Sequence, residues 1–177
     1  MLVTILTTGI AALLLLAAWN DIATRLIRNI IPVSIGALGI LLRLDAGLLP
    51  ALYSLILAQV IFLLLLWFAF RGWLGGGDAK LAAALILALP PAMVWDFITA
   101  TTVCGGILAL PYIVMARLQP FAPSLARAWH GGSGPASASI LNRIARAESR
   151  RLRQGGPLPY AVAIAAGGII TLFASVG

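Results

Sequence analysis

Long apolar stretches separated by short polar connections run through almost the whole chain. Six of these stretches are candidates for membrane-spanning helices: residues 2–19, 29–43, 49–70, 79–95, 97–116 and 157–176. A spanning helix needs about 20 mainly apolar residues, with about 17–25 being usual. The second and fourth stretches are short by this measure, and Pro90-Pro91 is expected to end or kink the fourth. The pattern predicts an all-α, polytopic membrane protein with about six transmembrane helices.

The composition excludes the common soluble classes. The chain has 177 residues, of which 62% are hydrophobic and 10% are charged, whereas a soluble domain has about 45–50% apolar and about 25% charged residues. A soluble domain of this length could not bury so much apolar surface. We therefore expect one integral membrane domain over residues 1–177. No Lys or Arg precedes Arg25, so we interpret the first stretch as a retained helix and not a removable signal sequence.

The basic residues are distributed unevenly among the connections. Of the 12 Lys and Arg residues, all except Arg43 lie in the first, third and fifth connections. Because loops rich in Lys and Arg stay on the cytoplasmic side, both termini are predicted to lie outside the cytoplasm. Trp19, Trp67, Trp73 and Trp95 fall near predicted helix ends, where aromatic side chains favour the membrane interface.

The longest connection covers residues 117–156. A flexible stretch, HGGSGPASAS, is followed by the basic stretch SILNRIARAESRRLRQ. Its apolar residues fall roughly on one helical face, which predicts a helix on anionic lipid headgroups; a plain solvated linker is the alternative. Orientation and lipid contacts explain the net charge of +7, so we expect no nucleic-acid partner. No cluster of His, Cys and acidic residues has metal-ligand spacing, and we expect no metal or other cofactor.

Two of the five acidic residues lie at matching helix ends. Asp21 follows the first predicted helix and Asp78 precedes the fourth, so the predicted orientation places both at cytoplasmic ends. Two carboxyl groups in close contact share a proton, because both cannot ionise cheaply. Such a pair can activate a water molecule and protonate a leaving amine. Alternatively, Asp78 is the N-cap of its helix and Asp21 is a polar residue at the membrane edge.

A run of three glycines, Gly75, Gly76 and Gly77, directly precedes Asp78. Backbone without side chains would let a substrate strand approach the carboxyl group closely. Gly72 and Gly77 have the spacing of a phosphate-binding loop. We exclude nucleotide binding, because Asp78 stands where that loop requires lysine.

Two segments carry a resemblance to a known family. GGGDAKLAAAL resembles the GxGD motif of the type IV prepilin peptidases, with Lys80 where the family commonly has lysine. DIATRLIRN resembles the other family segment: Asp21 matches the first catalytic aspartate and Asn29 the family's asparagine, whereas Arg28 stands where proline is usual. Near the end of the chain, LPYAVAIAAGG resembles the closing segment of the family.

The resemblance implies an intramembrane aspartyl endopeptidase of the bacterial inner membrane. Such an enzyme removes the basic leader from prepilins and pseudopilins at the cytoplasmic face. Asp21 and Asp78 would be its catalytic residues, supported by the glycine run, Lys80 and Asn29. The short, cysteine-free first connection resembles the small branch that serves tight-adherence (Flp) pili. Two other classes stay open: a proton-coupled transporter or channel subunit, and a non-catalytic scaffold of a pilus or secretion machine.

Overall fold

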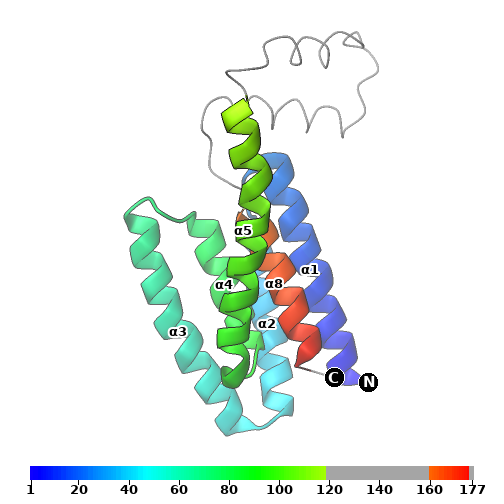
Figure 1. Cartoon of the computed structure of the whole chain (residues 1–177). Helices are drawn as coiled ribbons and strands as arrows, with labels where there is room; N and C mark the ends of the chain where they lie inside the picture. Colours follow the sequence, from blue (N-terminus) through cyan, green and yellow to red (C-terminus); the bar gives the residue numbers. More distant parts are fainter. Residues whose placement is uncertain (119–159, 176–177) are drawn as a thin grey trace. The chain divides into compact units, whose positions relative to one another are not determined.

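The computed structural model describes residues 1–118 and 160–175, and these residues contain helices without any strand. The helices are α1 (Leu2–Thr24), α2 (Ile30–Asp45), α3 (Leu48–Phe70), α4 (Gly76–Ala88), the 3₁₀ helix η1 (Pro91–Met93), α5 (Val94–Leu118) and α8 (Tyr160–Ala174), shown in Figure 1. Met1–Gly105 and Pro159–Gly177 form one compact unit, and Gly106–Leu158 forms a second. All packing described below lies within the first unit.

Three segments among the described residues are long and apolar enough to cross a membrane: Leu2–Thr24, Leu48–Phe70 and Pro91–Pro111. The other helices are shorter. α2 has 16 residues and α4 has 13, which correspond to lengths of about 24 Å and about 20 Å at the rise of an α-helix. The helices coincide with the six predicted stretches to within a few residues, apart from the ends of the first and the fourth. The predicted all-α, polytopic membrane fold is confirmed.

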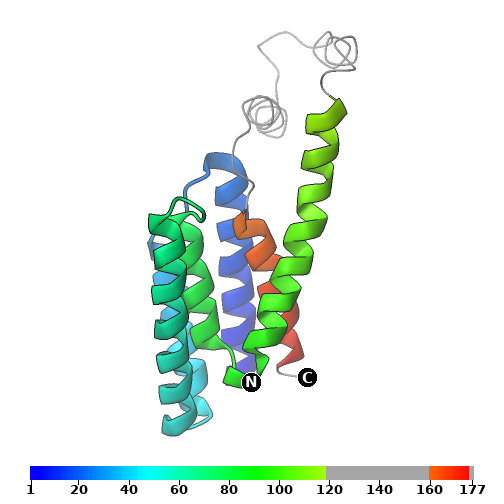
Figure 2. The same ribbon diagram turned by 60° about the vertical axis from the view of Figure 1, so that its left-hand side comes forward.

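α4 is largely enclosed by neighbouring helices. It packs against α2, α3 and α8, while α1 packs against α2 and α8; Figures 1 and 2 both show α4 beside α3. The buried residues of α4 are Ala79, Leu81, Ala82, Ala83, Leu85, Ile86 and Ala88. Because neighbouring helices cover α4, its length does not have to match the thickness of the lipid layer.

The proline pair ends α4, as the sequence predicts. The helix stops at Ala88, and η1 follows from Pro91. At this break the carbonyl oxygen of Leu89 accepts a hydrogen bond of 3.2 Å from Oγ of the buried Ser54 in α3. An unpaired carbonyl group in apolar surroundings is costly, so α3 supplies the partner that the broken helix lacks.

Glycines allow α2 and α8 to approach α4 very closely. A Cβ atom at Gly39 of α2 would lie 2.9 Å from Cα of Ala88. Gly168 of α8 lies against the side chain of Leu85, again with no room for a Cβ atom. Small residues at helix contacts are typical of membrane proteins, in which close packing replaces the hydrophobic effect between helices.

We expect Gly39→Ala to destabilise the folded protein by about 1–3 kcal/mol, the usual cost of overpacking a tight contact. Gly36→Ala is the matched control, because a Cβ atom there would lie 4.0 Å from its nearest neighbours on α4. Unfolding of both variants in detergent should be measured against the wild type. Equal stability of the two variants would contradict the close α2–α4 contact.

Candidate active site

Asp21 lies inside α1, because that helix continues for one turn beyond its apolar part to Thr24. This corrects the prediction that Asp21 follows the helix. Thr24 Oγ1 donates a 2.8 Å hydrogen bond to the carbonyl oxygen of Asn20, so polar residues here continue the helix. Asp21 is buried, with 7% of its surface exposed. The next residue after the helix, Arg25, has a left-handed backbone (φ 58°), and its N–H donates to the carbonyl oxygen of Asp21 at 2.9 Å.

Asp78 lies in the first turn of α4. The helix begins at Gly76, and its N-cap is Gly75, which makes no side-chain capping bond. The alternative interpretation of Asp78 as the N-cap is therefore wrong. Its Oδ1 atom is buried and has no hydrogen-bond partner among the described residues. The carboxyl group is thus held partly inside the protein without capping its helix.

The two aspartates influence each other electrostatically. The last turn of α1 and the first turn of α4 lie at the same end of the unit in both views (Figures 1 and 2). Burial and the negative charge of Asp21 raise the pKa of Asp78 to about 6, and the positive charge of Arg25 opposes this increase. Such an interaction requires the charged groups to lie near one another. The charges of Asp21 and Asp78 therefore lie near enough to interact, although their helices are far apart in sequence.

The three glycines before Asp78 are not equivalent. A Cβ atom at Gly75 would lie 2.6 Å from Oδ2 of Asp78, and one at Gly77 would lie 3.2 Å from Cβ of Ile27. At Gly76 a Cβ atom would meet no atom within 4 Å. The first glycine thus leaves room for the carboxyl group, and the third lets the segment after α1 rest on α4. The second glycine, Gly76, could carry a side chain without a steric clash.

Lys80 and Asn29 form a hydrogen bond between α4 and the segment that joins α1 to α2. Lys80 Nζ donates a 3.1 Å hydrogen bond to Oδ1 of Asn29, the residue that precedes α2. Together with the packing of Ile27 on Gly77, this bond holds the segment between α1 and α2 over the first turn of α4. The sequence motifs predict both residues separately but not their pairing, because the pairing depends on how the helices pack.

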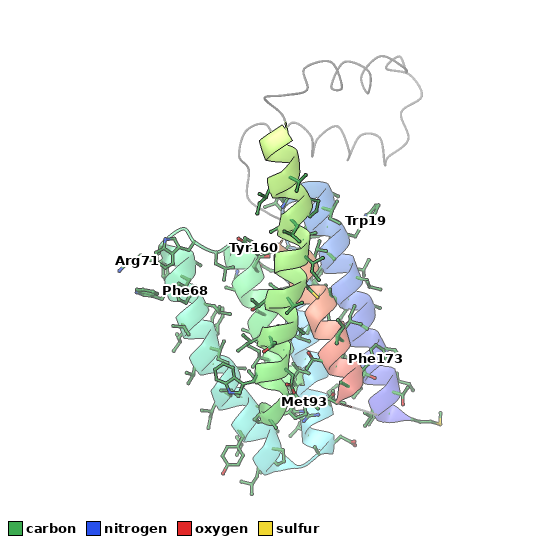
Figure 3. The ribbon with its side chains drawn as sticks, viewed as in Figure 1. Trp19, Phe68, Arg71, Met93, Tyr160 and Phe173 are labelled. Atoms are coloured by element: carbon green, nitrogen blue, oxygen red, sulfur yellow. The ribbon has the colours of Figure 1, made fainter. Side chains whose placement is uncertain are left out.

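Aromatic rings and one arginine form a cluster at the end of α3. The guanidinium carbon of Arg71 lies 4.7 Å from the centre of the Trp67 ring, and Trp73 stacks on Phe68 at 5.8 Å. Figure 3 shows Phe68 and Arg71 at this helix end and Trp19 on the outside of α1. All four tryptophans near helix ends are exposed, and their role at the membrane interface stays a prediction. The partners Phe68 and Arg71 were missed, although Arg71 lies one helical turn after Trp67.

The remaining acidic residues are away from this site or outside the described residues. Asp45 ends α2 and Asp96 lies in the first turn of α5, at helix ends opposite the start of α4 (Figure 1). Glu148 and the predicted lipid-binding connection beyond residue 118 lie outside the described residues. Within the described part of the chain, no three His, Cys, Asp or Glu side chains gather in a group that could hold a metal ion.

These features define an all-α, multi-pass membrane protein with two interacting acidic side chains at one end of its helices. The family model of the type IV leader peptidases matches residues 9–110, more than half of the chain. The chain belongs to the type IV leader peptidase family, which confirms the resemblance and implies a peptidase of this general type. The matched region contains both aspartates, the glycine run, Asn29 and Lys80. Comparisons with curated proteins and with solved structures gave no match.

We expect Asp21→Asn to lower the pKa of Asp78 below about 6, because the substitution removes a negative charge that raises it. The infrared band of the protonated Asp78 carboxyl group is identified by its absence in Asp78→Asn. Titration of this band in purified, lipid-embedded protein would measure the pKa. Asp45→Asn is the control and should leave the band unchanged. An unaltered titration in Asp21→Asn would mean that the two carboxyl groups do not interact.

Proposed function

We propose that this protein is an intramembrane aspartyl endopeptidase that removes the basic leader peptide from type IV prepilins and pseudopilins. The observation that carries the proposal is the electrostatic influence of Asp21 on Asp78, two partly or fully buried acids from separate helices. Family membership supports the general class of reaction. The pair supplies a proton acceptor and a proton donor at one place, as hydrolysis of a peptide bond requires.

In this mechanism the two carboxyl groups share one proton and hold a water molecule between them. The ionised group takes a proton from the water as its oxygen attacks the scissile carbonyl carbon. The protonated group donates a hydrogen bond to the carbonyl oxygen, on which negative charge develops. Transfer of a proton to the leaving nitrogen then breaks the C–N bond, and the pair returns to its starting charge. The proton acceptor and the proton donor are not assigned to one aspartate each, because the protonation of an interacting pair belongs to both groups together.

The glycine run suits a substrate in extended form. A peptide bond inside a helix is shielded by its own hydrogen bonds, so the pilin must unwind locally at the cleavage site. Gly76 is open on its side-chain side, and Gly75 leaves Oδ2 of Asp78 uncovered by a side chain. An extended strand can therefore approach the carboxyl group without displacing α4.

The distribution of basic residues supports a site at the cytoplasmic face of the bacterial inner membrane. Asp21, Asp78 and the basic first and third connections lie at the same ends of their helices, and basic loops favour the cytoplasmic side. The leader of a prepilin ends just before an apolar helix, so its scissile bond would lie at this membrane edge. The short first connection without cysteine supports a substrate of the tight-adherence (Flp) type.

We expect Asp21→Asn and Asp78→Asn each to reduce leader cleavage by at least about a hundredfold, because each removes one of the two proton-transfer groups. The protein would be co-expressed with a prepilin from the same genome, and the N-terminal mass of the pilin would be measured at matched expression. Asp45→Asn and Asp96→Asn are matched controls at the opposite helix ends and should cleave normally.

The same assay separates the other classes of protein. A scaffold would leave the leader uncut with the wild-type protein. A proton-coupled transporter would do the same, and would lose ion or substrate flux when either aspartate is replaced. Full cleavage by Asp21→Asn or by Asp78→Asn would reject the paired mechanism.

We expect Gly75→Ala to reduce cleavage strongly while Gly76→Ala retains it. The added Cβ atom at position 75 displaces the Asp78 carboxyl group, whereas at position 76 it meets open space. Gly75 is the extended N-cap residue, whereas Gly76 lies in the first turn of α4, so the two changes can differ in stability and the stability of both variants is measured as well. Equal cleavage rates for the two variants, compared at equal amounts of folded protein, would contradict this role of Gly75.

A further inference from the structure

Arg25 adopts a backbone conformation that residues with a side chain rarely use. Its φ of 58° makes it the only non-glycine residue with positive φ in the described part of the chain. Helices commonly end with glycine in this conformation, because glycine has no Cβ atom to clash with the following carbonyl group. Arginine at this position is therefore unfavourable for the backbone, and its side chain is the feature that needs an explanation.

The Arg25 side chain is directed into the protein at the aspartate site. Its Nε and Nη1 atoms are buried, and its charge acts on Asp78 in the direction opposite to that of Asp21. The segment that carries it is held over α4 by Ile27 on Gly77 and by the bond from Lys80 to Asn29. A residue that served only to orient the chain in the membrane would have no need of burial at this place.

The charged and titratable groups on the elements around Asp78 are few in the described residues. Lys80 is engaged with Asn29 and Arg71 lies over Trp67, while Arg28 is exposed. Arg43 belongs to the last turn of α2, at the far end of that helix. The charged and titratable groups nearest to this end of α4 come from its neighbours: Asp21 in α1, Arg25 directly after α1, Arg28 in the connection, Arg71 directly after α3, and Tyr160 at the start of α8.

We propose that Arg25 is a positioning residue that keeps one negative charge on the Asp21–Asp78 pair at neutral pH. Burial favours the neutral form of Asp78, and a pair in which both carboxyl groups are neutral contains no base to accept the proton of the water. A partly buried cation beside them offsets this tendency without touching the substrate. The inference rests on the proposed function of the pair and adds to it the group that sets its working pH.

The test uses Arg25→Gly, Arg25→Gln and Arg25→Lys, with Arg28→Gln as the matched control on the exposed side of the same segment. Arg25→Gly removes the charge but relieves the backbone, so it should accumulate at least as well as the wild type. In Arg25→Gly and Arg25→Gln, the acid limb of the cleavage rate should move to higher pH by about one unit, the lower end of the effect of one nearby opposite charge. Arg25→Lys and Arg28→Gln should keep the wild-type limb.

A second measurement does not require any substrate. A hydrophobic carbodiimide reacts with protonated carboxyl groups, and the mass of the peptide that contains Asp78 reports its modification across pH. Loss of the charge at position 25 should extend this modification to higher pH. A uniform loss of cleavage with unshifted pH profiles in both measurements would show that Arg25 is merely structural.

These measurements also separate the two proposals. If the wild type cuts no prepilin, the proposed function fails, and the carbodiimide titration still decides the role of Arg25. A titration that shifts in Arg25→Gly then supports the proposed effect of Arg25 on the aspartate pair, in a site of another function. A titration that does not shift overturns the proposal for Arg25.

Discussion

Holding two carboxyl groups close together inside a protein is the constraint on which this structure depends. Their mutual repulsion and the loss of water both oppose ionisation, so the site cannot assemble itself from attraction between its own parts. The surrounding helices have to enforce it. α4, which carries Asp78, is enclosed by α2, α3 and α8, and glycines at its contacts bring the neighbouring backbones to minimum distance. The favourable free energy of these helix contacts offsets the unfavourable free energy of holding the two carboxyl groups near each other.

The segment between α1 and α2 links the helix of Asp21 to the helix of Asp78. It follows the helix of Asp21 and carries the partly buried Arg25. Its Ile27 rests on Gly77, and it ends at Asn29, which accepts a hydrogen bond from Lys80. Acidic, basic and glycine residues of two sequence motifs therefore form a single contact. The glycine run matters through the space that it leaves, because none of Gly75, Gly76 and Gly77 has a positive φ.

Much of the fold could be predicted from the apolar pattern, since α-helices of a membrane protein follow long apolar stretches directly. Pro90-Pro91 correctly predicted the end of α4. The local pattern failed where tertiary contacts decide: glycine is a poor helix former, yet packing on Ile27 draws Gly77 into α4 and places Asp78 inside the helix. The pairing of Lys80 with Asn29 and the left-handed backbone of Arg25 are likewise products of helix packing, which no local pattern encodes.

The hydrogen bond from Ser54 to Leu89 has a consequence for motion. It joins α3 to the far end of α4 at the point where prolines interrupt the backbone, in surroundings where water cannot replace a broken bond. Sliding of α4 along its axis would break this bond, so the height of Asp78 is held from the opposite end of its helix. Under the proposed function, adjustment to an entering peptide would fall to the segment after Arg25, which rests on α4 through the packing of Ile27 on Gly77 and the hydrogen bond from Lys80 to Asn29.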